Sequence, residues 1–240
     1  MAADGLTYTI EDTANMSTAE IYGKVLIELA EKHDDIVGLS ADLAKSTKIG
    51  QLAAKFPDRF FNVGIAEQNM FGMAAGLAKS GLTPFVSTFA VFASMRAAEQ
   101  VRTDIAYQNL NVKIIATHSG TSFGQAGTTH HCTEDLAIMR SFANMVVINP
   151  ADGIETANAV NAAYQHQGPV YIRINRGFDK QLYERSDYGF EIGKAVELHP
   201  GTDITIIACG VAAYNAADAA SILEKEDGLS VRVINMHTIK

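Results

Sequence analysis

The sequence predicts an α/β protein built on a mostly parallel sheet with helices on both faces. Short apolar runs such as VKIIAT (112–117) and PVYIRI (169–174) are typical of buried strands. Segments of helical length separate these runs, and such alternation indicates parallel strands joined by helical crossovers. With 240 residues and 48% hydrophobic residues, the chain can bury the core that this fold requires.

The elements can be predicted in chain order. Ser17 and Glu20 form a capping box at the start of the first helix, and Gly81 is placed to end the third. The predicted helices cover 17–33, 47–55, 66–79, 90–107, 134–142 and 153–165, and the predicted strands cover 36–40, 60–63, 83–88, 112–117, 145–149 and 169–174. A glycine-rich loop at 118–133 lacks apolar periodicity, and loops of this length inside compact domains usually carry function.

The composition changes after the last of these strands, at RGFDKQLYERSDYGF (176–190). We therefore predict an N-terminal extension over 1–16, a main domain over 17–177, a linker over 178–190 and the beginning of a second α/β domain over 191–240. That last part holds one predicted helix, 211–224, and a strand at 231–235. A unit of about 50 residues buries little surface alone, so we expect this domain to be incomplete here and the native chain to continue.

The overall composition excludes several classes of function. The net charge of −8 disfavours a nucleic-acid-binding protein, whose binding surface is usually basic. The two cysteines, Cys132 and Cys209, are no disulfide framework and fit a reducing compartment. The N-terminus has no signal-peptide pattern, and no apolar run approaches the roughly 18 residues of a membrane span. We expect a cytoplasmic protein that binds neither membrane nor nucleic acid.

Common nucleotide and hydrolase motifs are absent, since the sequence has neither a GxGxxG after a strand nor a GxxxxGK[ST] or GxSxG. The segment THHCTED (129–135) has no zinc-ligand spacing, and we predict no metal site in this chain. Its histidines are either polar residues at a helix start or active-site residues on a functional loop.

Glu67 stands out because it follows a strand and opens a helix rich in small apolar residues. Taken alone, it is an acid stabilised by the dipole at a helix N-terminus. Phe89 and Phe92, in STFAVFASM, are by themselves most simply core aromatics. These simple interpretations lose weight when the motifs are considered together.

Several motifs agree in order and spacing with one family. The segments GIAEQNMFGMAAGLAKSGLTPFVSTFAVF, VKIIATHSGTSFGQAGTTHH, INPADGIE and YIRINRG resemble the pyrimidine-binding domain of transketolases over about 17–177. The tail ITIIACG…VRVINMHTIK resembles the beginning of the family's third domain. The GDG motif of the family's diphosphate-binding domain is missing, which implies a split enzyme with this chain as its C-terminal subunit.

The resemblance implies thiamine diphosphate as the cofactor and assigns residues to it. Glu67 matches the glutamate that faces N1′ of the aminopyrimidine, where a neutral carboxyl, favoured by an apolar site, could donate a hydrogen bond. This bond would help the cofactor's own amino group take the proton from the thiazolium carbon. Phe89 and Phe92 match the aromatic pocket, with Phe92 stacking on the ring, and Met95 stands where many members have Tyr. Asp42 and Leu43 match a segment near the cofactor at the subunit interface.

On the substrate side, His118 and His130 match histidines of the substrate channel and count with Glu67 as catalytic candidates. Ser46 and Arg176 match residues that contact the sugar phosphate.

Two positions depart from the family's pattern. Ala126 stands where transketolases usually carry Asp, and Ala19 stands near a phosphate-binding arginine. An unusual ketose donor or aldehyde acceptor is therefore expected.

The resemblance also implies partners. The missing domain would hold the diphosphate and Mg²⁺, so an N-terminal transketolase subunit and an α₂β₂ assembly are expected. Two alternatives stay open. The chain could belong to another thiamine diphosphate enzyme, such as a deoxyxylulose-phosphate synthase or a 2-oxoacid dehydrogenase β subunit. It could also be a non-catalytic binding subunit of the same fold, which the joint presence of Glu67, Phe92 and His130 disfavours.

Overall fold

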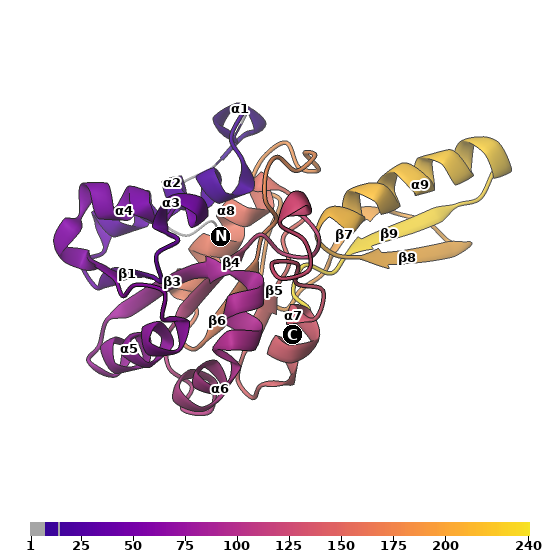
Figure 1. Ribbon diagram of the computed structural model, residues 1–240. Coiled ribbons are helices and arrows are strands. Elements are labelled where there is room, and N and C mark those ends of the chain that lie inside the picture. The colour runs from indigo at the N-terminus through magenta and orange to yellow at the C-terminus, as the bar shows by residue number, and fades with distance from the viewer. Residues whose placement is uncertain (1–7, 14) are drawn as a thin grey trace.

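The computed structural model describes residues 8–13 and 15–240, and a six-stranded parallel sheet forms the centre of its larger part (Figure 1). The strand order is β2-β1-β3-β4-β6-β5. The strands are β1 (Ile36–Ser40), β2 (Phe60–Asn62), β3 (Thr83–Phe89), β4 (Lys113–Thr117), β5 (Val146–Ile148) and β6 (Val170–Arg173). The predicted α/β architecture with a parallel sheet is confirmed.

Helices cover both faces of this sheet. Those of the larger part are α1 (Ile10–Thr13), α2 (Thr18–Lys32), α3 (Ala44–Thr47), α4 (Gly50–Lys55), α5 (Glu67–Lys79), α6 (Ala98–Gln100), α7 (Asp135–Ser141) and α8 (Gly153–Gln165). Two short 3₁₀ turns, Pro57–Arg59 and Gly124–Ala126, complete the connections, and two π-helical segments flank α6.

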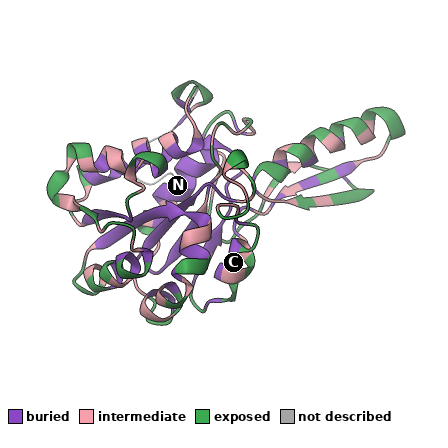
Figure 2. Cartoon of the chain, in the orientation of Figure 1, coloured by how far each residue is buried: buried purple, intermediate pink, exposed green. Residues whose placement is uncertain are grey.

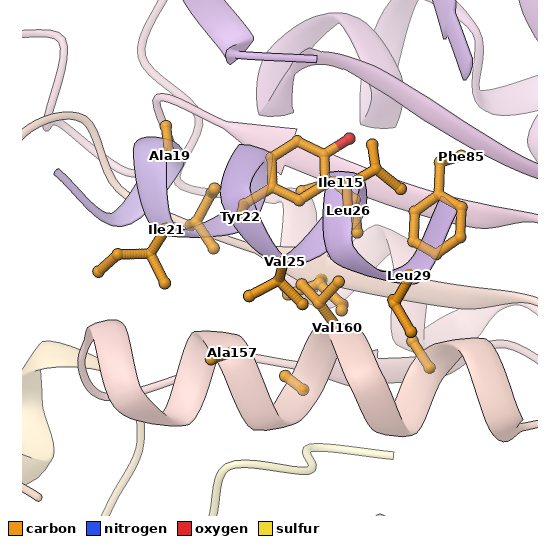
Figure 3. Close-up of a cluster of buried hydrophobic side chains, with 14 of the residues drawn as sticks. Ala19, Ile21, Tyr22, Val25, Leu26, Leu29, Phe85, Ile115, Ala157 and Val160 are labelled. Atoms are coloured by element: carbon orange, nitrogen blue, oxygen red, sulfur yellow. The ribbon is translucent and has the colours of Figure 1, made fainter. Parts of the chain in front are cut away.

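Alternate residues of the strands point into two separate cores. On one face, α2 and α8 pack against side chains such as Phe85 and Ile115, as Figure 3 shows. On the other face, α5, α7 and the π-helical segments pack against neighbours of those residues, including Val86 and Ile114. Except for the edge strand β2, which is largely exposed, the strands are buried along almost their whole length (Figure 2), as expected for a parallel sheet covered twice.

The start of α2 follows the sequence prediction closely. Ser17 Oγ accepts a hydrogen bond from the Glu20 backbone N–H at 3.3 Å, and the Glu20 carboxylate accepts one from the Ser17 N–H at 2.9 Å. The predicted capping box is therefore confirmed. Glu20 also forms an ion pair with the segment between α3 and α4, because its Oε1 lies 3.1 Å from Lys48 Nζ.

Two predicted helices differ from the structure. The helix expected at 47–55 begins only at Gly50, as α4, and a separate short helix, α3, ends at Thr47, because Lys48 between them adopts a left-handed backbone with φ of 69°. The regular helix expected at 90–107 is mostly π-helical, over Phe92–Arg96 and Val101–Ala106. A π turn accommodates an extra residue in a helix and is frequent at functional sites.

A second, smaller sheet extends away from the first (Figure 1). It contains β7 (Val196–His199), β8 (Ile204–Ala208) and β9 (Val231–Asn235) in the order β7-β9-β8, with α9 (Val211–Asp227) packed on it. β8 runs parallel to β9, and β7 runs antiparallel to it.

A buried polar network joins the two parts. Asn235 Nδ2, at the end of β9, donates to Glu155 Oε1 at 2.9 Å and to the hydroxyl of Tyr183 at 2.9 Å. Tyr188 donates to the same carboxylate at 2.9 Å and stacks on Tyr183 with 3.9 Å between ring centroids. Burial raises the pKa of the Glu155 carboxyl to about 7 despite these donors. The predicted linker is thus packed against α8 through its tyrosines.

Candidate active site

The candidate residues gather at the carboxyl edge of the parallel sheet. Asp42 follows β1, Phe89 ends β3 and His118 follows β4. Glu67 begins α5, which follows β2 after a short turn, and Arg176 lies shortly after β6. Carboxyl ends of parallel strands meet at one edge of a sheet, which is where open α/β folds bind ligands.

Glu67 is almost completely buried at this edge, with only 1% of its side chain exposed. Its Oε1 accepts a hydrogen bond from Arg96 Nη1 at 2.8 Å. Its Oε2 is buried and has no hydrogen-bond partner among the described residues. The purely apolar surroundings expected for Glu67 are therefore wrong in one respect, since a guanidinium from the neighbouring π-helical segment offsets the cost of burying the acid.

Arg96 makes a second contact in the same place. Its guanidinium carbon lies 4.0 Å from the centre of the Phe92 ring, a cation–π arrangement. Arg96 is otherwise open to solvent, with 46% of its side chain exposed. This residue was not predicted from the sequence, because nothing in the local pattern of 92–96 indicates a partner in α5.

Two aromatic residues and two histidines form a compact cluster beside Glu67. The ring centroids of Phe89 and His118 are 4.1 Å apart, and those of Phe92 and His130 are 5.5 Å apart. Phe89 and Phe92 stack at 5.7 Å. The structure thus brings together four of the predicted residues from three different segments of the chain.

Phe123 lies at the centre of this cluster and was not predicted. Its ring is 4.8 Å from that of His118, 5.2 Å from that of His130 and 5.4 Å from that of Phe89. The Arg176 guanidinium lies 5.2 Å from the same ring. Its position in the glycine-rich loop is the one signal that could have indicated it, since an aromatic residue in such a loop needs a packing partner.

His118 is held in a defined orientation. Its backbone is left-handed, with φ of 58°, and its Nδ1 lies 2.8 Å from the Thr117 hydroxyl. Burial lowers the pKa of this histidine to about 4, and the positive charges of Arg176 and His130 contribute in the same direction. His118 is therefore neutral near pH 7, and its imidazole can accept or donate a hydrogen bond without adding positive charge.

Arg176 is exposed at the rim of the cluster, and its backbone N–H donates to Ser122 Oγ at 3.0 Å. Ala126, in the 3₁₀ turn of the same loop, is half-buried and presents no polar side chain. Ala19, on α2, is only 5% exposed and belongs to the core cluster on that face of the sheet (Figure 3).

The remaining predicted residues lie further out. Asp42 is exposed, and its backbone N–H donates to Asn62 Oδ1 at 3.0 Å. Leu43 is half-buried and donates its N–H to Ser40 Oγ at 3.2 Å, while Ser46 is exposed on α3. Met95 is 42% exposed beside Arg96. These four residues border the edge rather than the aromatic cluster.

Two further features concern metals and membranes. Within residues 8–13 and 15–240, no group of three or more His, Cys, Asp or Glu side chains is arranged to hold a metal ion. The helices in that part of the chain are all too short or too polar to cross a membrane.

The parallel sheet, with an acid and an aromatic cluster at its carboxyl edge, defines a ligand-binding α/β domain, and comparison with known proteins places it in a family. The transketolase pyrimidine-binding domain matches residues 14–179, and the transketolase C-terminal domain matches residues 193–240. The chain belongs to the transketolase family, as the sequence resemblance predicted. Membership of this family implies dependence on thiamine diphosphate.

Its similarity is to parts of divided enzymes in particular. It is 49% identical to a putative transketolase C-terminal section of Methanocaldococcus jannaschii, over 91% of this chain and 69% of that protein. It is 40% identical to one of the subunits of an apulose-4-phosphate transketolase of Phocaeicola vulgatus, over 90% of this chain and 69% of that protein. A solved split-gene transketolase, described as an inactive β4 tetramer, superposes with a TM-score of 0.84 at 47% identity, over 92% of this chain and 71% of that one.

The site described above fits the pyrimidine half of thiamine diphosphate. A polar ring nitrogen needs a buried partner, and Glu67 Oε2 is a buried polar atom that lacks one among the described residues. Flat rings need aromatic faces, which Phe92 provides. The described residues offer no comparable set of oxygen ligands for a metal-bound diphosphate.

Proposed function

We propose that this chain is the C-terminal subunit of a thiamine diphosphate-dependent transketolase. In this proposal it transfers a two-carbon ketol unit from a ketose or ketose phosphate donor to an aldehyde acceptor. The observation that carries the proposal is the buried carboxyl of Glu67, with one oxygen that has no partner among the described residues, linked through Arg96 to the ring of Phe92. The combination suits a flat, nitrogen-containing ring better than it suits a core position.

Thiamine diphosphate, when bound, supplies the electron sink for making and breaking the carbon–carbon bond. The chain's own part is to orient the ring and to handle a proton. Glu67 would hold and release a proton at its carboxyl oxygen, facing a ring nitrogen, while Phe92 supports the face of the ring. Phe89, buried behind Phe92, fixes the position of that support.

The substrate would lie beside the two histidines. His118, neutral and anchored by Thr117, can exchange a hydrogen bond with a carbonyl or hydroxyl group. His130 is half-buried across the cluster and offers a second such group. Arg176, exposed at the rim, provides the positive charge for a phosphate, so the charge-assisted contact would come from Arg176 rather than from His118.

A partner would complete this site. We propose that an N-terminal transketolase subunit holds the diphosphate and Mg²⁺, with Asp42, Leu43 and Ser46 close to the junction and the whole assembled as α₂β₂. Support comes from the relatives named as a C-terminal section and as a transketolase subunit, and from the absence of a metal-ligand group in the described part of the chain. We further propose that this assembly is cytoplasmic.

The donor is proposed to differ from ordinary pentose and hexose phosphates. The side chain of Ala126 offers no hydrogen bond at a position where transketolases usually have an acid. Ala19 packs in the hydrophobic core and cannot contact a phosphate. Relatives named for apulose 4-phosphate and for 6-deoxy-6-sulfo-D-fructose support a substrate outside the common set. These names describe the relatives, and kinetics with a range of ketoses would identify the donor of this chain.

A different thiamine diphosphate activity is the second candidate. Proteins named 1-deoxy-D-xylulose-5-phosphate synthase also match this chain, at 35% identity in one case, but the chain covers only 37% of that protein. His118 and His130, meeting in one cluster, favour ketol transfer over the reaction of a 2-oxoacid dehydrogenase β subunit. A non-catalytic subunit would have no need to keep Glu67 buried with one oxygen that lacks a partner among the described residues.

Reconstitution tests the function directly. The full chain would be mixed with a candidate N-terminal transketolase subunit, thiamine diphosphate and Mg²⁺, and then supplied with pairs of ketose donors and aldehyde acceptors. Mass spectrometry should detect products lengthened by two carbons. Decarboxylation of pyruvate with transfer to glyceraldehyde 3-phosphate would favour the synthase instead, and no reaction with any pair would support the non-catalytic alternative.

A further inference from the structure

We propose that Arg96 takes the place of the cofactor's pyrimidine ring in the free chain and must move away before the cofactor can bind. The inference rests on the proposed function, because it concerns the ring site formed by Glu67 and Phe92. Arg96 contacts both residues at once, with Nη1 2.8 Å from Glu67 Oε1 and the guanidinium carbon 4.0 Å from the Phe92 ring centre.

The guanidinium resembles the ligand it would replace. It is planar, it carries N–H donors at its edge, and it stacks readily on aromatic faces. An aminopyrimidine ring is also planar and also has nitrogen atoms at its edge. A single site that offers a carboxylate oxygen beside an aromatic face therefore suits either group, but not both in the same position.

Accessibility shows that something has to move. Only 1% of the Glu67 side chain is exposed, and its Oε2 is completely buried, so no ring nitrogen can reach the carboxyl in this conformation. Arg96 contacts the carboxyl and is free to leave, because 46% of its side chain already faces solvent.

The backbone under Arg96 gives the side chain an unusual position. Arg96 ends the π-helical segment Phe92–Arg96, and Ala97 N–H bonds back to the Phe92 carbonyl at 3.1 Å. This wide turn places Arg96, four residues after Phe92, over the face of the Phe92 ring. The same turn lets Arg96 reach α5, 29 residues away in sequence, at Glu67.

The contact would have two effects. In the free chain it compensates the charge of a buried acid, which would otherwise be costly. It also lowers the apparent affinity for the cofactor, because only the fraction of molecules with Arg96 withdrawn can accept the ring. Arg96 would thus delay occupation of the ring site until binding of the diphosphate by a partner adds to the affinity.

The test measures binding of thiamine, which has the pyrimidine ring but no diphosphate, to the full chain by ligand-observed NMR titration. We expect Arg96→Ala to bind thiamine about three- to tenfold more tightly than the wild-type chain, the size expected from losing one half-exposed ion pair and one cation–π contact. Arg96→Lys keeps the charge but loses the planar group, and its affinity should lie between the two. Arg102→Ala, which removes an exposed arginine further along the same stretch, should bind like the wild type.

Displacement can also be observed without comparing affinities. The ¹⁵N signals of the Arg96 guanidinium should move toward those of a solvent-exposed arginine when thiamine is added to the wild-type chain. Circular dichroism of Arg96→Ala and Arg96→Lys checks that both variants are folded.

Equal or weaker binding by Arg96→Ala, in a folded variant, would overturn the inference, and so would Arg96 signals that do not respond to bound thiamine. If the reconstituted enzyme still transfers ketol units, the proposed function stands and only the role of Arg96 is wrong. If no variant binds thiamine and the reconstituted enzyme shows no transfer, both the inference and the proposed function are wrong.

Discussion

Burying the carboxyl of Glu67 costs free energy, and the neighbouring residues of the site explain why the chain keeps it there. A carboxyl that is almost completely buried needs a partner, and the chain supplies Arg96 for one oxygen and, among the described residues, none for the other. An acid placed only to stabilise a helix N-terminus would be better exposed, because water would solvate its second oxygen. The burial of Glu67 therefore indicates a role beyond helix stability.

Changing Glu67 to Gln tests that role. The amide keeps the size of the side chain and can still accept a hydrogen bond, but it cannot take up and release a proton. We expect the fold to remain and proton exchange at the thiazolium carbon of the cofactor to slow by about 10²–10⁴-fold in the reconstituted enzyme, as for other acid–base groups. Hydrogen–deuterium exchange followed by NMR measures this rate. An unchanged rate would remove Glu67 from proton handling.

His118 offers a prediction about pH. Its pKa is lowered to about 4, first by burial and then by the charges of Arg176 and His130, so its ring should stay neutral down to that pH in an NMR titration of the folded chain. Arg176→Gln should move this pKa only part of the way back toward the ordinary value for histidine, because His118 stays buried. Since an unfolded histidine takes up its proton near pH 6.5, the stability of the chain should fall as the pH drops from about 6.5 to about 4.

Urea unfolding at several pH values checks the consequence for stability. The wild-type chain should lose more stability than a His118→Gln variant over this interval. Protonation of His118 near its ordinary pKa, or equal losses in both proteins, would contradict the prediction.

At the level of elements, the loop between β4 and α7 would form the substrate side of the proposed site. It carries His118, Phe123, Ala126 and His130 between two segments of regular structure. Gly120, Gly124 and Gly127 have positive φ values of 58°, 58° and 74°, a conformation in which a side chain would be strained. These glycines allow the loop to turn back repeatedly, so that residues as far apart as His118 and His130 both contact Phe123.

Ala126 connects this loop to the choice of donor. If the natural donor lacks the hydroxyl that an acid would contact, Ala126→Asp would bury an unpaired carboxylate and lower kcat/KM for that donor. A loss of about one to two decades is expected from an unsatisfied polar group. Steady-state kinetics of the reconstituted enzyme, with the natural donor and with xylulose 5-phosphate, measures the effect.

The exposed neighbour Gln125 provides a matched control, since Gln125→Asp adds the same charge at the adjacent position and should change neither donor's kinetics appreciably. A clear gain by Ala126→Asp on xylulose 5-phosphate, with no better donor found, would instead show that the chain uses an ordinary ketose phosphate.

At the scale of the whole molecule, the proposed function implies that the chain provides only part of the cofactor's surroundings. We expect the chain alone to bind thiamine diphosphate poorly, because the described residues hold no oxygen cage for Mg²⁺ and the diphosphate. Calorimetry should show no micromolar binding until the N-terminal subunit is added. Micromolar binding by this chain alone would contradict the division of the site between two subunits.

The sheet could be predicted from the sequence, because buried parallel strands leave a local signal. Runs such as 112–117 and 169–174 are mostly apolar and separated by helical segments, and they form β4 and β6. The capping box of α2 was equally predictable, since Ser17 and Glu20 act within one helical turn. The resemblance to transketolases further indicated Glu67, Phe92 and the two histidines, because these residues lie within motifs that are contiguous in sequence.

Only the three-dimensional packing, and not the sequence, decides which residues of these motifs contact one another. Arg96 and Glu67 are paired because α5 and the π-helical segment pack side by side on one face of the sheet. Phe123 fills the cluster because the loop after β4 turns back on itself. Such contacts depend on distances across the fold, which no periodicity along the chain encodes, whereas strands and caps arise from neighbours a few residues apart.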